Sequence, residues 1–451
     1  MTPFNPNEAP ESASTSIQAA PVPFLDAVSG NAETGDQAAT PKAGIGFQIA
    51  LVTAMFGMYF VTIVPAIITL AVRMNTVAGG NQQLATNALS ITLLIGTVVA
   101  MVANPLIATF SDRTTLRLGR RRPWMIGGTV VGFVGTVVAG LATDVWLIIV
   151  GGGLVQLGFG AAMVATTALI PERLAPEQRG KLSGIVGMSV AVSIFLGIQA
   201  TNLFIQYQGS LMIVPGLIAV VTVAILLLSM GNDRPAVRAG LEPFRLRRFV
   251  GSFWINPLKH RDFGIVWISR FLVGAATAAF QAYTLYFVMN NLSLPIEGAT
   301  GVNALAQTIA LPVSVALFLI SGWLSDRMGR RKIFVLGGGV VVALALVLAT
   351  VTNSQTMFVV VSLVMTVGSS FFLTVDLALA ADVIPNKGEA ARGMAVYGLA
   401  TTTPNSIVSI IAPLILAVGS GTSGNYTLLF MVMAPVALVG ALMTLAIRSV
   451  K

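Results

Sequence analysis

Two ionisable residues lie inside long apolar stretches of the chain. Arg270 lies about seven residues into the apolar stretch 263–289, and Asp376 lies near the end of the stretch 355–382. A charge inside a membrane-spanning helix is costly to desolvate, so such a residue is a functional candidate by default. A buried carboxylate can bind and release a proton as a cation beside it approaches or leaves. Asp376 and Arg270 are therefore our candidates for proton coupling, and a static ion pair that braces the helices is the alternative.

A charged motif occurs twice in the chain. Its two copies begin with Ser-Asp-Arg at 111–113 and 325–327 and end with Gly-Arg-Arg at 119–121 and 329–331. Extra residues at 114–117 lengthen the first copy. Gly-Gly at 127–128, Ile-Pro at 170–171 and Arg-Gly at 179–180 recur at 337–338, 384–385 and 392–393, a shift of about 214 residues. Matches in the same order and at nearly the same shift indicate an internal repeat of a half-chain.

The composition indicates which elements must carry these residues. The 451 residues are 55% apolar and only 10% charged, and their mean hydropathy is +0.85. A soluble domain carries about 25% charged residues, so too little polar surface remains here to face water. Apolar stretches long enough to span a bilayer fall at 45–70, 84–110, 123–142, 145–170, 182–205, 210–230, 263–289, 300–322, 332–352, 355–382, 392–417 and 426–447. The sequence therefore predicts an all-α integral membrane protein with twelve transmembrane helices.

The basic residues are distributed unevenly among the predicted loops. Nearly all of the 26 lysines and arginines lie near the termini or in loops that follow even-numbered helices, whereas Arg73 lies on the opposite side. The positive-inside bias therefore predicts that both termini are cytoplasmic. The longest loop is basic and divides the helices into six and six. We expect a disordered cytoplasmic tail at 1–42, a six-helix bundle at 43–230, a cytoplasmic basic loop at 231–262 and a second six-helix bundle at 263–451.

Residue types that are rare in the chain exclude several kinds of chemistry. There is no cysteine and one histidine, His260, which excludes disulfides, thiolate metal sites and a Cys/His nucleophile. No Gly-x-x-x-x-Gly-Lys-Ser/Thr loop is present to bind the phosphates of a nucleotide. We therefore expect neither an enzyme nor an ATP-driven pump, and no metal site. The net charge of +9 resides in the cytoplasmic loops, so we expect no nucleic-acid partner.

The repeated motif resembles the signature of the major facilitator superfamily, Gly-x-x-x-Asp-Arg-x-Gly-Arg-Arg. The second copy fits this signature fully, through Gly322, Asp326, Arg327, Gly329, Arg330 and Arg331. The first copy has Ala108 in the place of the glycine and carries the extra residues. That longer form, with Ala168–Glu172 ahead of Pro176–Gly180, looks like the glycoside–pentoside–hexuronide and sucrose transporter branch.

The resemblance implies the major facilitator fold, in which two six-helix bundles surround a central cavity that opens alternately to either side. Helices 7 and 10 line the cavity in that fold, which would bring Arg270 and Asp376 together as an ion pair. The signature would act as a cytoplasmic gating motif whose charges pair while the inner face is closed; fixing the topology is the alternative role. Its residues here are Asp112, Arg113, Gly119, Arg120, Arg121, Gly322, Asp326, Arg327, Gly329, Arg330 and Arg331.

Polar side chains at mid-depth in the predicted helices suit a neutral polar solute. Sugars are recognised by hydroxyl, amide and aromatic groups. The candidates for the substrate cavity are Tyr59, Thr62, Gln156, Thr166, Gln199, Asn202, Gln281, Tyr283, Asn303, Gln307 and Asn405. For each of them an interhelical hydrogen bond is the alternative role. Sodium-coupled members of the branch carry carboxylates inside helices 2 and 4, which this chain lacks before Asp112 and Glu172. Proton coupling through Asp376, or facilitated diffusion with no coupling, is therefore favoured over sodium coupling.

We therefore expect a secondary active transporter that moves a small polar solute, a sugar or glycoside, by alternating access with proton coupling. The proton gradient is its expected energy source, with no cofactor. The alternatives are a proton-coupled exporter of drugs or metabolites and a non-transporting membrane sensor. The segment 182–205 lacks the Gly-Pro-x-x-Gly-Gly element of many such exporters, which favours the importer. The expected partners are the solute and the lipid bilayer, and we expect a monomeric, multi-pass protein of the cell (inner) membrane.

Overall fold

The protein is all-helical in the part of the chain that the structure covers. The computed structural model describes residues 42–231, 233, 260–328, 330–383, 390–419 and 424–448. Nearly all of the predicted tail at 1–42 and most of the predicted basic loop at 231–262 lie outside these residues. Within them, twelve spans are long and apolar enough to cross a membrane. The prediction of twelve transmembrane helices is confirmed.

The helices fall into two halves, separated by the connection between Ser229 and Arg261. In the first half they are α1 (Ile45–Val64), α2 (Leu70–Val77), α3 (Gln82–Asp112), α4 (Arg122–Gly140), α5 (Val145–Thr167), α6 (Leu169–Arg173), α7 (Pro176–Leu203) and α8 (Gln208–Ser229). In the second half they are α10 (Arg261–Asn291), α11 (Ile296–Met328), α12 (Arg331–Thr350), α13 (Gln355–Asp382), α14 (Ala390–Leu416) and α15 (Tyr426–Met443). A π-helical turn at Pro65–Thr69 joins α1 to α2, so together they form the first span.

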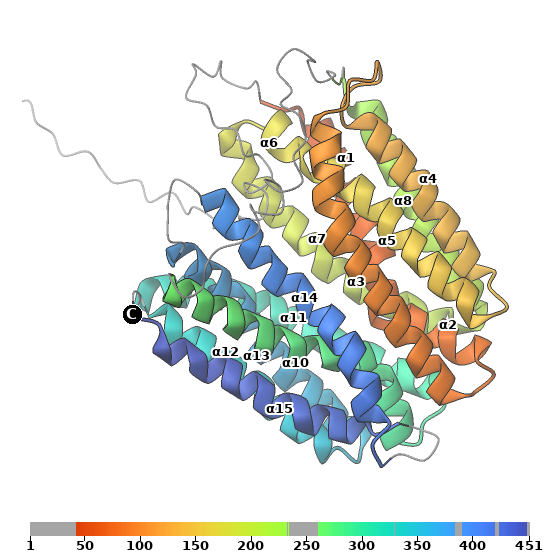
Figure 1. Ribbon diagram of the computed structural model, residues 1–451, viewed down its shortest axis with the longest axis vertical. Coiled ribbons are helices and arrows are strands. Elements are labelled where there is room, and N and C mark those ends of the chain that lie inside the picture. Colours follow the sequence, from red (N-terminus) through yellow and green to blue (C-terminus); the bar gives the residue numbers. More distant parts are fainter. Residues whose placement is uncertain are drawn as a thin grey trace, which may run out of the picture.

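The two halves form two bundles that lie side by side. Figure 1 shows the first-half helices, coloured orange to yellow-green, beside the second-half helices, coloured green to blue. Helices α3 and α14 pack together across the interface between the bundles, and so do α7 and α11. The two six-helix bundles predicted from the sequence repeat are therefore present, and each contributes two helices to these contacts.

The same pair of helices packs most closely in both bundles, namely α4 with α5 and α12 with α13. Glycines bring each pair together. A Cβ placed on Gly128 would lie 2.6 Å from the carbonyl oxygen of Gly158, and one placed on Gly338 would lie 2.9 Å from that of Gly368. Small residues of this kind allow membrane helices to approach closely, because van der Waals contact rather than the hydrophobic effect holds them together. The repeat read from the sequence thus extends to equivalent glycine contacts.

The first helix is longer than predicted. The apolar pattern indicated an end near residue 70, whereas the span continues to Val77. Pro65 lacks a backbone N–H and disturbs the regular ladder, and the N–H of Leu70 bonds to the carbonyl of Pro65 in a π-helical turn. The helix therefore passes the proline and carries Arg73 into its last turns.

Arg73, the basic residue predicted on the opposite side from the other charges, is held by the end of a neighbouring helix. Its Nη2 donates to the carbonyl oxygens of Gly140 at 3.0 Å and Ala142 at 2.6 Å. The last carbonyls of a helix have no partner within it and carry the negative end of the helix dipole. Arg73 thus stabilises the end of α4, which gives it a structural role.

Candidate functional site

Asp376 lies at the centre of a buried polar cluster within the second bundle. Its side chain is fully buried, and its Oδ2 lies 3.2 Å from Nη1 of Arg270. The hydroxyl of Tyr397 donates to the same oxygen. The other carboxylate oxygen, Oδ1, is buried and has no hydrogen-bond partner among the described residues. The structure thus brings together the two ionisable residues singled out in the sequence, and it adds Tyr397 as a third member.

Three different helices supply this cluster. Arg270 belongs to α10, Asp376 to α13 and Tyr397 to α14. The guanidinium of Arg270 also lies 5.8 Å from the ring centre of Phe372 and 6.0 Å from that of Tyr397. Such cation–π contacts partly replace the water that the guanidinium loses on burial. The cluster therefore depends on the relative placement of α10, α13 and α14, and a movement of any of them would change its contacts.

Tyr397 was missed by the sequence analysis, although its position carried a usable signal. It lies seven residues after the start of α14 at Ala390, and Asp376 lies six residues before the end of α13 at Asp382. These two helix ends are joined by a short connection and lie on the same side of the bundle. At 1.5 Å per residue both side chains therefore lie about 10 Å from that side. Comparing the depths of polar residues on adjacent helices would have selected Tyr397.

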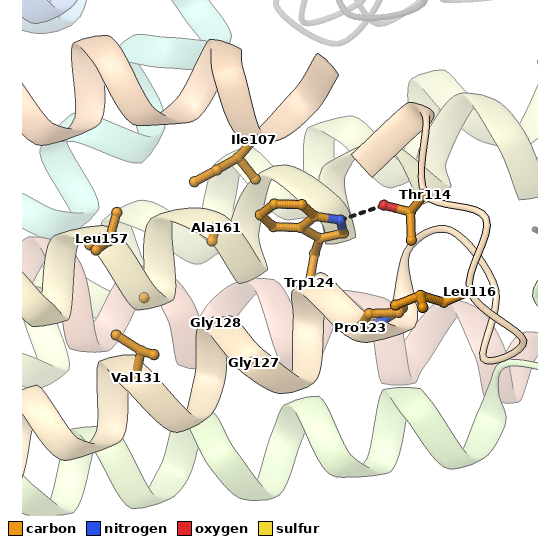
Figure 2. Close-up of a pocket in the computed structure, with 11 residues that line it drawn as sticks. Ile107, Thr114, Leu116, Pro123, Trp124, Gly127, Gly128, Val131, Leu157 and Ala161 are labelled. Atoms are coloured by element: carbon orange, nitrogen blue, oxygen red, sulfur yellow. Dashed lines mark hydrogen bonds between the residues drawn. The ribbon is translucent and has the colours of Figure 1, made fainter. Parts of the chain in front are cut away.

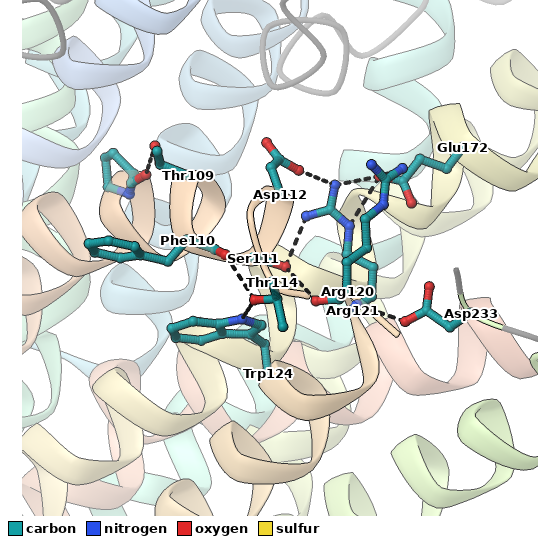
Figure 3. A network of polar contacts seen from close by, with 11 residues as sticks. Thr109, Phe110, Ser111, Asp112, Thr114, Arg120, Arg121, Trp124, Glu172 and Asp233 are labelled. Atoms are coloured by element: carbon teal, nitrogen blue, oxygen red, sulfur yellow. Dashed lines mark hydrogen bonds and ion pairs between the residues drawn. The ribbon is translucent and has the colours of Figure 1, made fainter. Parts of the chain in front are cut away.

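The first copy of the charged motif forms a second cluster, which is shown in Figure 3. Arg121 is buried, with only 4% of its side chain exposed, and it bonds to Asp112 and Glu172. Its Nη1 also donates to Oγ of Ser111 at 2.9 Å. Arg120 lies 3.0 Å from Glu172 with 36% of its side chain exposed. The arginines of the motif therefore differ sharply in burial, and Arg121 holds the cluster together.

The electrostatics of Arg121 follow from these contacts. Burial alone lowers the pKa of its guanidinium, but the hydrogen bond and charge of Glu172, followed by those of Asp112, raise it above its ordinary value overall. Opposite charges at this distance favour the ionised form. Arg121 is therefore positively charged at any pH at which a membrane protein is studied. The cluster joins α3, α5–α6 and the start of α4 through one permanent charge.

The chain segment after the sixth span is tied to the same motif. The side chain of Asp233 accepts hydrogen bonds from the backbone N–H groups of Arg121 at 2.7 Å and Arg122 at 3.1 Å. These are unpaired N–H groups at the start of α4, where a carboxylate is favoured. Nη2 of Arg122 donates to the carbonyls of Met230 and Gly231, both at 2.9 Å. The motif thus fixes the start of the inter-bundle connection.

Several residues of the second copy of the motif lie outside the described part of the structure. These are Gly329, the surroundings of Gly322 and the side chain of Asp326, so the predicted role of Asp326 stays a prediction. Of the remaining members, Arg327 and Arg330 are exposed and Arg331 is partly buried. In the first copy Arg113 is partly buried, and Gly119 has φ of +99°, a conformation open to glycine.

Hydrogen bonds between described residues tie the two bundles together at the end opposite these motifs. The hydroxyls of Tyr283 and Ser90 lie 2.6 Å apart, and those of Tyr426 and Thr86 lie 2.8 Å apart. The hydroxyl of Tyr286 donates to the carbonyl of Ala71 at 2.9 Å. In each pair one residue belongs to the first bundle and one to the second. Buried tyrosines therefore hold the bundles together at this end.

The predicted substrate-cavity residues fall into three groups. Gln199 and Tyr283 bond across the bundle interface, Gln199 to Thr308 at 2.8 Å. Thr62, Thr166 and Asn303 each donate to a carbonyl of their own helix, which is a structural use of the side chain. Gln281 and Asn405 are exposed, and Tyr59, Gln156, Asn202 and Gln307 are partly buried.

Two of the partly buried residues contact other helices. Asn202 in α7 faces α11, because its Oδ1 lies 3.5 Å from where a Cβ on Gly301 would be. Cγ of Gln156 in α5 lies 3.0 Å from the corresponding point at Gly96 in α3. The α7–α11 contact thus gathers Gln199 and Asn202 at the bundle interface, while Gln156 lies within the first bundle. The substrate role of all these residues stays a prediction.

The family of the chain follows from comparison with known proteins. The model of the Major Facilitator Superfamily matches residues 46–314 and 295–451, which together cover nearly all of the chain. The chain belongs to the Major Facilitator Superfamily. Together with the twelve candidate spans, this family makes the chain a multi-pass membrane protein. The family that the repeated motif resembled in the sequence is confirmed.

Curated relatives of the chain include sugar transporters at low identity. It is 27% identical to the sugar transport protein MST8 of Oryza sativa subsp. japonica over 51% of this chain and 50% of that protein. It is 21% identical to the glucose transporter GlcP of Staphylococcus epidermidis over 57% of this chain and 61% of that protein. A short match at 30% identity, over 12% of this chain and 10% of the relative, joins it to the sucrose transport protein SUT5. The chain spans at most about three fifths of the length of these relatives.

Solved structures of transporters share the fold of the chain. A mutant of the nucleoside transporter NupG has a TM-score of 0.72 at 11% identity, with 89% of this chain and 99% of that chain covered. A D-xylose–proton symporter has a TM-score of 0.65 at 16% identity, with 90% and 98% covered. At these identities the likeness establishes the fold alone and does not identify the solute.

Proposed function

We propose that this transporter moves a small polar solute, a sugar or glycoside, together with protons by alternating access. The observation that carries the coupling is the fully buried carboxylate of Asp376, held by Arg270 and Tyr397 on two other helices. An ionisable residue inside a membrane span is costly to bury and marks ion and proton pathways in many transporters. The sugar transporters among its curated relatives support the solute class.

The cluster provides a proton site whose occupancy depends on helix position. While Arg270 and Tyr397 both reach Oδ2, the carboxylate is stabilised in its charged form. When α10 or α14 moves and these contacts lengthen, the buried carboxylate loses that support and binds a proton instead. The unpartnered Oδ1 is the oxygen that is free to receive it. Proton binding and helix movement are thereby linked.

The link to the solute runs through α14. This helix carries Tyr397 and packs against α3 of the first bundle. The tyrosine ties between the bundles close the end opposite the charged motifs, so the solute would enter or leave at the motif end in this state. In the alternate state the ties open and the motif charges pair across the bundles. Protonation of Asp376 would bias this two-state equilibrium.

The choice of protons over sodium is supported by the sequence of the first bundle. Its helices 2 and 4 lack, before Asp112 and Glu172, the carboxylates that sodium-coupled members of the resembled branch carry there. The proton gradient is the energy source in this proposal. We propose further that the transporter acts as a monomer in the cell (inner) membrane, with both termini in the cytoplasm.

The proposal is tested by solute flux into proteoliposomes. A panel of radiolabelled mono- and disaccharides is offered with an inward proton gradient and with the gradient collapsed by an ionophore. At least one sugar should accumulate only with the gradient. The variant Asp376→Asn should lose accumulation and keep counterflow exchange, because the site then stays neutral in both states. The control Asp144→Asn, which changes an exposed helix-capping carboxylate, should accumulate the sugar normally. Gradient-driven accumulation by Asp376→Asn, or no flux of any sugar, would overturn the proposal.

A further inference from the structure

An apolar groove lies on the first bundle beside the charged motif. It runs between α3, α4 and α5, has a volume of about 520 Å³, and is lined by Ile107, Leu116, Trp124, Val131, Leu157 and Ala161 among others. Figure 2 shows the indole of Trp124 standing in it between Ile107 and the loop that carries Thr114 and Leu116. A volume of this size is in the range of pockets that hold small ligands.

The internal repeat explains why the groove is open. Gly128 contacts Gly158 in the first bundle as Gly338 contacts Gly368 in the second. Corresponding positions in this part of the repeat are therefore about 210 residues apart, because the extra residues 114–117 precede them. At that shift Trp124 corresponds to Phe334, and Ala161 corresponds to Phe371. In the second bundle the rings of Phe334 and Phe371 stack with their centres 6.2 Å apart. The first bundle has a methyl group where the second has a phenyl ring.

The mouth of the groove is also particular to the first bundle. The extra residues 114–117, which the second copy of the motif lacks, supply Thr114 and Leu116 to its lining. Nε1 of Trp124 donates to Oγ1 of Thr114 at 2.8 Å, which fixes the indole against the loop. Tryptophan is favoured at the boundary between the hydrocarbon and the headgroups of a bilayer. The two features that form the groove, Ala161 at its floor and the extra residues 114–117 at its mouth, are therefore both absent from the second bundle.

The groove opens onto the surface that faces the bilayer. Along α4 beside it, Ile126, Val130 and Val134 are exposed by 43%, 58% and 49%, and they stand on a spanning helix. Leu116 and Leu118 in the loop are exposed by 55% and 57%. Exposed apolar side chains that line one face of a spanning helix mark the surface that contacts lipid. A hydrocarbon chain from the bilayer is therefore the occupant that can reach the groove.

The charge at the mouth is positive. Five arginines lie between residues 113 and 122. Arg121 and Arg120 pair with Glu172, and Arg122 bonds to backbone carbonyls of the next segment. Arg117 lies between the exposed Leu116 and Leu118, is itself exposed, and forms no ion pair or hydrogen bond with the described residues. A cation in this position is available to a phosphate at the membrane surface.

We propose that this groove binds one acyl chain of an anionic phospholipid, with its phosphate against Arg117. The apolar lining receives the chain, Trp124 lines the mouth at the level of the glycerol, and the basic loop selects the charge of the headgroup. This site is independent of the proposed sugar and proton sites, because it involves neither Asp376 nor the bundle interface. The lipid site could therefore be disproved without affecting the proposed transport function, and the reverse also holds.

Quenching of tryptophan fluorescence by brominated lipid tests the proposal directly. In a variant that keeps Trp124 and has phenylalanine at Trp146, Trp254, Trp267 and Trp323, brominated phosphatidylglycerol is titrated into phosphatidylcholine bilayers. Quenching should saturate at a low fraction of phosphatidylglycerol, and brominated phosphatidylcholine should quench less. Arg117→Gln should reduce the preference about fivefold, since one basic side chain near an anionic surface contributes about 1 kcal/mol. Equal quenching by both lipids would overturn the proposal.

Two glycines related by the repeat offer a matched pair of groove variants. A Cβ meets no atom within 4 Å at either Gly127, which lines the groove, or Gly337, which is its counterpart in the second bundle. Gly127→Leu should fill the groove and abolish the saturable quenching, whereas Gly337→Leu should leave it unchanged. Native mass spectrometry of the full chain with all its tryptophans should show phosphatidylglycerol retained by the parent protein and by Gly337→Leu, and lost from Gly127→Leu. Equal retention by both variants would contradict the site.

Discussion

Arg270 and Tyr397 share a single acceptor, Oδ2 of Asp376, although they belong to different helices. The arrangement leaves the second oxygen of the same carboxylate buried and unpartnered. A buried acceptor without a donor is unfavourable, and its presence in a native protein usually reflects a function. The pair of donors therefore fixes both the position of Asp376 and the side from which a proton can reach it.

Removing the hydroxyl of Tyr397 tests its share in the cluster. Tyr397→Phe keeps the ring and deletes a hydrogen bond to a charged group, which is worth about 1.5–3 kcal/mol. We expect a lower melting temperature in detergent and weaker proton-driven accumulation of the solute. Tyr207→Phe changes an exposed tyrosine and serves as the control. A Tyr397→Phe protein with unaltered accumulation would show that the hydroxyl has no part in coupling.

The pairing of Arg270 with Asp376 can be measured as a double-mutant cycle. Arg270→Gln leaves a fully buried carboxylate without its cation, which costs about 3–5 kcal/mol. The double variant Arg270→Gln with Asp376→Asn removes both charges and should recover much of that loss. Melting temperatures of the parent, the two single variants and the double variant give the coupling energy. If the losses of the single variants simply add, the pair does not stabilise the protein.

The two adjacent arginines of the first motif should differ in their contribution to stability. Arg121→Gln removes a buried cation from Asp112 and Glu172, and we expect a loss of roughly 2 kcal/mol, reduced because both carboxylates are partly exposed. Arg120→Gln, whose side chain is 36% exposed, should cost no more than about 1 kcal/mol. Thermal unfolding of the two variants in the same lipid–detergent mixture makes the comparison. Equal losses would mean that burial does not set their contributions.

Weakening the tyrosine ties should open the end that they close. Ser90→Ala and Thr86→Ala each remove a hydrogen bond of about 1 kcal/mol to a tyrosine of the other bundle, which shifts a two-state population about fivefold. The chain has no cysteine, so spin labels at Thr143→Cys and Gln355→Cys report the distance between the bundles at that end. The distance distribution should gain a longer component. Thr97→Ala, which removes a hydrogen bond inside α3, should leave the distances unchanged; an equal change in this control would contradict the role of the ties.

Much of the fold was predictable because the bilayer imposes simple requirements on a sequence. A helix must be apolar over its full crossing, so twelve apolar stretches gave twelve spans. The repeated motif at 111–121 and 325–331 could be recognised because charged loops stand out in an apolar chain. The end of the first helix could not be predicted, because the passage through Pro65 depends on a π-helical turn that leaves no mark in the hydropathy.

The sequence by itself determined which residues carry unusual charge: Arg270 and Asp376 are conspicuous because almost nothing else in the spans is ionised. Only the tertiary structure decided their partners. Tyr397 is one tyrosine among apolar residues until α14 places its hydroxyl against Asp376. Likewise the difference between Ala161 and Phe371 becomes an open groove only where Gly128 and Gly158 bring two helices together. A charged residue in an apolar stretch can be seen in the sequence, because the cost of burying it depends only on its immediate neighbours. A shared hydrogen bond or an unfilled space depends on helices that are separate in the sequence and come together only in the fold.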